Sequence, residues 1–289
     1  MRAIEHSRRH PKNNGRKRAP HGHPSAVRAF WPGLLLLMAL PAVALDGGNE
    51  LTEYREASSR FTSLVAAAEL RKTPQQLQSK EVTLLVAGLS DEKRFLKSGP
   101  YAVSELGYLV EVCGMANKAV MSLALFDLKT HLDPKGSPQA IARQTIDLMQ
   151  KNAAAFGSQL GHLQPFLIRC TAKEVRPLTE FTLSLPPEQF TDVRRKGLDQ
   201  VRAGMVELFL GVLQSVSNPD YDEKYRTALV QSLAESAPSL VPALPISTRH
   251  QMQSTADAVM KDSPASFGVY LKAIRVALRD TTCKGLCSL

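Results

Sequence analysis

Four cysteines are the residues of this chain whose type and spacing most clearly indicate chemistry: Cys113, Cys170, Cys283 and Cys287. An even number of cysteines in a chain with an export signal is typical of a disulfide framework. We therefore predict two disulfides, and among the three pairings that four cysteines allow we favour Cys113 with Cys170. The other two would close a short loop, which the conformational freedom of Gly285 permits. The alternative is that the C-terminal pair staples the tail to the helices that carry the first two.

The favoured pairing makes a demand on the helices around it. If two long helices fold back on each other at residues 134 and 135, Cys113 comes to lie opposite position 156. That is about 14 residues short of Cys170, or roughly 20 Å at 1.5 Å per residue, whereas disulfide partners need Cα atoms within about 7 Å. We therefore expect the second helix to break near Pro165 and to fold over.

The C-terminal cysteines have C-x-x-x-C spacing, which also raises the question of a redox or metal site. They lack the C-x-x-C spacing of a dithiol redox motif, and no histidine lies near them in the sequence. Besides the structural bridge, free buried thiols remain an alternative. The pattern favours a bridge.

Three histidines follow residue 44, and none of them suggests a metal ligand. His131, His162 and His250 have no histidine or cysteine three or four residues further on, so a helical ligand pair is absent. His131 is explained by the dipole at the end of a helix. His162 is a weak candidate base, and His250 follows Arg249, which suggests either an anion site or a solvated face. We predict no metal and no cofactor.

Local catalytic motifs are also missing from the sequence. There is no P-loop, dinucleotide-binding, zinc-protease or nucleophile-elbow pattern, and the serine in residues 157–161 is misplaced for the last of these. Residues 220–223 begin like a calcium loop but lack its glycine and its distant glutamate. Helix N-capping by Asp220 or Asp222 explains these acids without a metal. We assign no catalytic residue.

An apolar run over residues 30–44 has the anatomy of a secretory signal. It is about 15 residues long, follows basic residues and ends with Ala42 and Ala44 in a small-x-small pattern. A membrane span needs roughly 20 residues, so we predict cleavage after Ala44, with an uncleaved anchor as the alternative. No lipobox cysteine follows the run. The protein is then periplasmic or secreted, and a membrane is involved only if the signal stays uncleaved.

The segment before this run is unusually long and basic. Residues 1–26 have almost no apolar content, so we expect translation to start at Val27 instead. A nucleic-acid-binding arm or a twin-arginine signal at Arg8 and Arg9 is the alternative. Residues 1–44 hold eight Lys/Arg and one acid, which leaves 28 Lys/Arg and 26 Asp/Glu in the remainder. A net charge of +2 on 245 residues gives no electrostatic footprint for nucleic acid.

The remaining residues 45–289 show the periodicity of helices throughout. Apolar residues recur at spacings of three and four, and no alternating strand pattern finds a partner. We predict helices over 51–70, 80–96, 101–132, 138–173, 187–216, 222–236, 247–261 and 264–279, and an irregular connection or short helix over 175–187. Ser137 should cap the fourth helix, with Pro138 as its first residue. The result is an all-α bundle of about seven or eight helices, stapled by disulfides, with a weak subdivision near residue 186.

These observations favour a function without an enzymatic site. We expect an exported, non-enzymatic module that binds an unknown protein or a small apolar ligand. The helix over 101–132 is apolar on most of its surface, which suits a central helix or the wall of an apolar cavity. The alternative is a periplasmic hydrolase or metal-dependent enzyme built from the scattered histidines and acidic residues.

Overall fold

The computed structural model describes residues 48–283 and 285–288. This part of the chain folds into helices and contains no strand, which confirms the predicted all-α class. The helices of ten residues or more are α1 (Gly48–Arg71), α2 (Lys80–Leu89), α4 (Leu106–Ala124), α6 (Pro138–Ala155), α7 (Gly157–Ser184), α8 (Asp192–Ser217), α9 (Glu223–Leu240), α10 (Ile246–Asp262) and α11 (Gly268–Leu278). The expected signal segment, with Ala42 and Ala44, lies outside the described residues.

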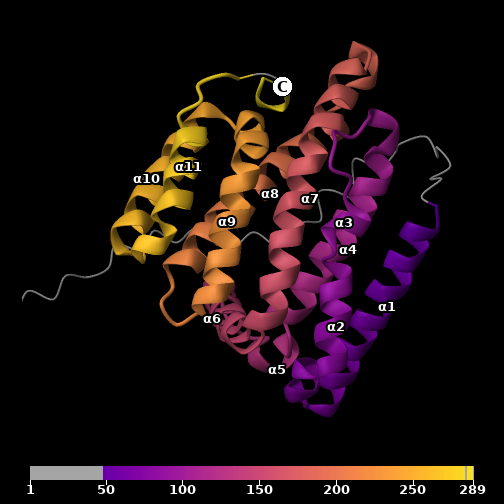
Figure 1. Cartoon of the computed structure of the whole chain (residues 1–289), viewed down its shortest axis with the longest axis vertical. Coiled ribbons are helices and arrows are strands. Elements are labelled where there is room, and N and C mark those ends of the chain that lie inside the picture. The colour runs from indigo at the N-terminus through magenta and orange to yellow at the C-terminus, as the bar shows by residue number, and fades with distance from the viewer. Residues whose placement is uncertain (1–47, 284, 289) are drawn as a thin grey trace, which may run out of the picture.

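Helix α7 runs through the middle of the bundle, with α9 on one side and α4 on the other (Figure 1). Its 28 residues bury side chains on almost every turn, and Leu163, Phe166 and Cys170 have no exposed surface. A helix buried on several faces is typical of the centre of a bundle. The buried apolar side chains of the described residues form one contiguous cluster around it. The subdivision near residue 186 stays a prediction.

The break in the second long helix was predicted at the wrong place. Helix α6 ends at Ala155 and α7 begins at Gly157, whereas Pro165 and Pro177 both lie inside α7. Phe156 leaves helical geometry with φ −110° and ψ 22°, and its buried ring packs edge-on against Phe126 with ring centroids 5.5 Å apart. This aromatic contact fixes the corner at Phe156. A proline inside a helix costs about 3 kcal/mol, but the packing along α7 outweighs that cost, so Pro165 stays helical.

The connection predicted over 175–187 is also helical for most of its length. Helix α7 continues to Ser184, and the Thr182 hydroxyl donates to the Leu178 carbonyl one turn earlier at 2.7 Å. Pro177 is buried in the bundle, so tertiary packing overrides its breaking tendency. Polar and apolar residues alternate over 179–185, but the segment is helical and places Thr182 in the core and Leu183 in solvent.

Two other predicted helices are each split in the structure. After α4, Asp127 adopts the left-handed conformation with φ 63° and starts the single-turn α5 (Leu128–His131). After α2, the Asp91 side chain accepts from the Lys93 backbone and caps the single-turn α3 (Glu92–Phe95). The predicted cap of α6 is confirmed, since the Ser137 side chain accepts from the Ala140 backbone at 3.2 Å.

One segment of the described residues, Val103–His131, is long and apolar enough to cross a membrane by length and composition. Half of its most apolar window is buried inside the bundle. Within it, α4 packs on α1, α6 and α7. The apolar composition of this segment is therefore accounted for by its place in the core.

Glu174 of α7 is a buried carboxyl group, 3% exposed, and its Oε1 has no hydrogen-bond partner among the described residues. Burial raises the pKa of Glu174 well above its ordinary value of 4.5. The native state then binds more protons than the unfolded chain above pH 4.5, so stability falls as pH rises from there until the native pKa is reached.

Glu174→Gln should therefore stabilise the protein at pH 8 and lose this advantage near pH 4.5. The difference should grow by about 1.4 kcal/mol for each pH unit above the ordinary pKa. Urea unfolding at several pH values measures it. Glu56→Gln, at an exposed glutamate of α1, is the control and should change the free energy of unfolding by less than about 0.5 kcal/mol. A pH-independent difference for Glu174→Gln would contradict the prediction.

Candidate functional site

The first disulfide joins the two helices at the centre of the bundle. Cys113 of α4 and Cys170 of α7 are both fully buried, and their Cα atoms lie 5.6 Å apart. The turn at Phe156 lets α7 return along α4, so the bond forms without a break at Pro165. Asn152 of α6 supports the corner, because its buried side chain donates to the carbonyls of Ala124 and Phe126, both at 3.0 Å.

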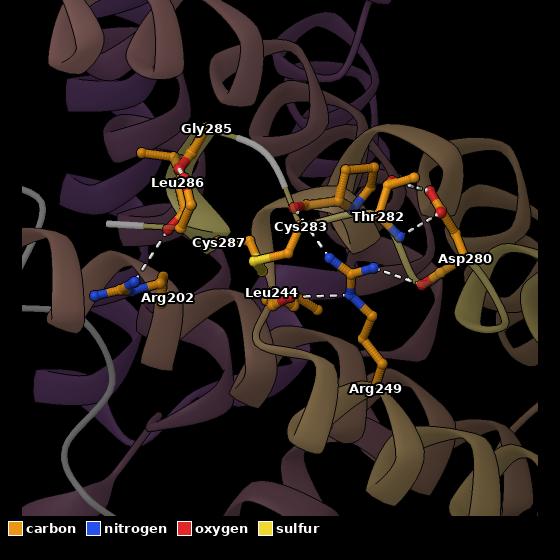
Figure 2. The surroundings of a disulfide bond; sticks show 11 residues. Arg202, Leu244, Arg249, Asp280, Thr282, Cys283, Gly285, Leu286 and Cys287 are labelled. Carbon is orange, nitrogen blue, oxygen red and sulfur yellow. Dashed lines mark hydrogen bonds between the residues drawn. A yellow bond between two sulfur atoms is a disulfide. The ribbon is translucent and has the colours of Figure 1, made fainter.

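The second disulfide closes a small loop at the C-terminus. Cys283 and Cys287 have Cα atoms 5.2 Å apart. Between them Gly285 has φ +62°, and a Cβ built there would lie 2.3 Å from Cγ2 of Thr179, so both conformation and space require glycine. Leu286 is buried, and the Arg202 guanidinium of α8 donates to its carbonyl at 3.0 Å (Figure 2). The loop is therefore held onto α7 and α8.

Arg249 of α10 holds the segment that leads into this loop. Its side chain has no exposed surface and donates to the carbonyl of Leu244 at 2.9 Å, of Pro242 at 3.1 Å and of Asp280 at 2.5 Å (Figure 2). Burial lowers the pKa of Arg249, and the negative charge of Asp280 opposes that shift. Arg249 thus joins α10 to the segment 242–244 and to the segment at Asp280. Its partners are backbone carbonyls and not the bound anion that the sequence suggested.

The other candidate residues lie in separate parts of the molecule. The His131 ring contacts the Asp127 carbonyl at 3.1 Å, His162 is exposed on α7, and His250 borders a small pocket of about 200 Å³ next to Arg249. Asp222 caps α9 by accepting from two backbone N–H groups at 2.9 and 3.2 Å. Among the described residues, no group of three or more His, Cys, Asp or Glu side chains is arranged to hold a metal ion.

A large cavity lies where α4, α6, α7, α8 and the start of α9 meet. Its volume is about 660 Å³. Most of its wall is apolar, and the apolar side chains that line it include Val120, Met121, Ile146, Leu167, Leu208 and Val212. Gly211 of α8 also lines it, and a Cβ built there would meet nothing within 4 Å. Open space beside a helical glycine means that the wall leaves room for another group.

One end of the cavity carries tyrosine and amide groups. The Tyr225 hydroxyl donates to Oε1 of Gln164, and the ring of Tyr221 lies 5.8 Å from that of Tyr225. Burial raises the pKa of both tyrosines, so their hydroxyls stay protonated at neutral pH. At this end the cavity offers hydrogen bonds and aromatic surface but no charge from the phenols.

The residues that form the cavity were not identified as a site from the sequence. They come from five helices and the connection between α8 and α9, and those on the helices have the ordinary spacing of a core face, so no local motif marks them. The highly apolar segment 101–132 was the one signal, and it supplies part of the wall. Comparisons with protein-family models, with curated proteins and with solved structures found no match for the chain.

Proposed function

We propose that the protein is an exported, non-enzymatic module that holds a small apolar ligand in this cavity. The observation that carries the proposal is the cavity itself, about 660 Å³ with a mostly apolar wall. Small-molecule sites are typically clefts of roughly 300–1,000 Å³ lined by apolar side chains and a few polar groups. Side chains of α4, α6, α7 and α8 build such a wall here, with the tyrosine pair among its polar groups.

Export is supported by the cysteine chemistry of the described residues. Both cysteine pairs are at bonding distance, and disulfides persist mainly in oxidising compartments. The apolar run ending at Ala44 supplies the matching signal in the sequence. The two together support a periplasmic or secreted location. The alternative, a hydrolase or metal-dependent enzyme, has less support because its candidate histidines and acids lie apart.

Filling the cavity tests the proposal directly. Gly211→Phe places a ring where a Cβ meets nothing within 4 Å, so it should occupy the cavity without disturbing α8. Binding of the uncharged fluorophore N-phenyl-1-naphthylamine should weaken at least tenfold, and the melting temperature should not fall, because glycine is a poor helix former. Fluorescence titration and thermal unfolding measure the two effects.

Gly114→Phe is the matched control. Gly114 is an exposed helical glycine of α4, does not line the cavity and also has nothing within 4 Å of a built Cβ. This variant should bind the dye as the unmodified protein does. Native mass spectrometry of the protein from its own host should in addition show extra mass that is lost on denaturation. Equal dye binding by both variants, or no binding by the unmodified protein, would overturn the proposal.

A further inference from the structure

A second pocket, of about 550 Å³, lies on a different face of α7 from the cavity. Its walls come from the single turn α3, the segment 96–101 and α9, and α7 lines it with Arg169, Ala172, Lys173 and Arg176. These four residues have the spacing of one helix face. No residue lines both the pocket and the cavity, so a ligand held here is separate from that of the proposed function.

Positively charged side chains outnumber carboxylates in this pocket. Five Lys/Arg side chains and two Glu side chains line it. Two further acids lie just outside the lining, where Glu105 pairs with Lys97 and Glu180 pairs with Arg176. Even with these acids included, five cations face four carboxylates, so the pocket keeps an excess of positive charge. The five cations are Lys93, Lys97, Arg169, Lys173 and Arg176.

Lys173 is a partly buried cation of this pocket that has no carboxylate partner among the described residues. Its Nζ donates to the carbonyl oxygens of Lys97 at 2.9 Å, of Ser98 at 3.1 Å and of Gly99 at 3.4 Å, which holds this wall of the pocket in place. Carbonyl oxygens satisfy the three N–H groups of an ammonium but do not neutralise its charge. A charge removed from water without a counter-charge is costly, so the site favours an anion.

Ser236 of α9 contributes a buried hydroxyl with no partner. The residue is 4% exposed and lines the pocket, and its hydroxyl makes no hydrogen bond with another described residue. Its oxygen is not fully enclosed, so a ligand in the pocket can reach it. By contrast, the Ser232 hydroxyl one turn earlier donates to the Pro165 carbonyl at 3.0 Å. Buried polar groups are almost always satisfied, so the free hydroxyl points to a ligand group.

The packing of α7 against α9 brings the hydroxyls and the uncompensated cation to the same part of the pocket. The Ser232 bond and a bond of 3.0 Å from Nε of Arg169 to Oε2 of Glu235 occur in the same order along both helices, so the helices run in the same direction. One turn beyond the second bond lie Lys173 on α7 and Ser239 on α9, and both line the pocket. The exposed Ser239 hydroxyl also has no partner among the described residues.

We propose that this pocket binds the anionic group of a small organic acid, a carboxylate or a phosphate. The group accepts hydrogen bonds from the hydroxyls of Ser236 and Ser239, and its charge balances the ammonium of Lys173. Arg176 pairs with Glu180 through Nε alone, which leaves its two terminal amino groups to bind the same anion. The inference does not depend on the proposed function, because the two sites have no residue in common.

Isothermal titration calorimetry with benzoate, phenyl phosphate and benzyl alcohol tests the inference. These three probes carry one aromatic ring with a carboxylate, a phosphate and an uncharged head respectively. One acid or both should bind the unmodified protein at least tenfold more tightly than the alcohol, and the acid that binds identifies the group. The binding should weaken at high ionic strength, because the pocket is open to solvent and the attraction is electrostatic.

Two substitutions locate the binding site. Ser236→Ala should weaken the acid about fivefold, the worth of one ordinary hydrogen bond, without lowering the melting temperature, since the hydroxyl has no partner to lose. Arg176→Gln should weaken it about tenfold, because hydrogen bonds to charged groups are stronger. Ser58→Ala, at a serine of α1 that is equally buried, and Arg143→Gln, at an exposed arginine of α6, are the matched controls outside the pocket.

The control variants should bind the acid as the unmodified protein does. No binding of either acid by the unmodified protein, equal binding of benzyl alcohol, or equal acid affinity in the pocket and control variants would overturn the inference. N-phenyl-1-naphthylamine should bind all four variants normally, because none of the four residues lines the cavity. Its titration therefore reports on the proposed function independently of the acids.

Discussion

Replacement of both Cys113 and Cys170 by alanine is expected to lower the free energy of unfolding by about 4 kcal/mol. The two residues are 57 positions apart, and the chain entropy that such a crosslink removes from the unfolded state is worth about 4 kcal/mol at 25 °C. The bond also joins α4 to α7, the helix at the centre of the bundle. Urea unfolding of the double variant measures the loss. The dye should also bind this variant more weakly, because the lost bond joins α4 and α7, which both line the cavity.

The C-terminal bond provides the control for this prediction. Cys283 and Cys287 are only four positions apart, so the same entropy argument assigns their bond about 2 kcal/mol. Their double alanine variant should be clearly more stable than the Cys113 and Cys170 variant and should bind the dye normally. Equal losses in the two variants would show that chain entropy does not determine the stabilisation.

The sequence allowed the helical class and the favoured cysteine pairing to be predicted, but not the geometry that brings the first pair together. Periodicity identifies a buried face wherever it occurs, so the helix over 101–132, which contains α4, was predicted to be central. Which residue makes the corner depends on contacts between distant segments. Phe156 turns the chain because its ring meets Phe126, whereas Pro165 stays helical because α7 is packed along its whole length. The intrinsic preference of proline was overridden by tertiary packing.

The cavity shows a different limit of sequence reasoning. Val212 and Leu208 repeat along α8 just as core residues do, and in the structure they border open space. Whether an apolar face meets another side chain or a void depends on how the helices are spaced in three dimensions.

Arg249 was missed for a related reason, because an arginine beside a histidine is usually solvated. The main chain around residues 242–244 turns its carbonyls inward, and the C-terminal segment adds that of Asp280. A planar group with five donors can satisfy all three carbonyls at once. The position therefore requires arginine for reasons that no local pattern of residues expresses.

Arg249→Leu is accordingly expected to lower the free energy of unfolding by about 3–5 kcal/mol, because each carbonyl left without its donor costs about 1–3 kcal/mol. The carbonyls of Pro242, Leu244 and Asp280 would lose their donor, and the side chain of leucine cannot replace it. Arg249→Lys should lose less, because an ammonium can satisfy part of the set. Arg279→Leu, at an exposed arginine of the same region, should change stability by less than about 0.5 kcal/mol. Urea unfolding ranks the three variants, and a loss at Arg249 no larger than at Arg279 would mean that the arginine does not anchor the C-terminal segment.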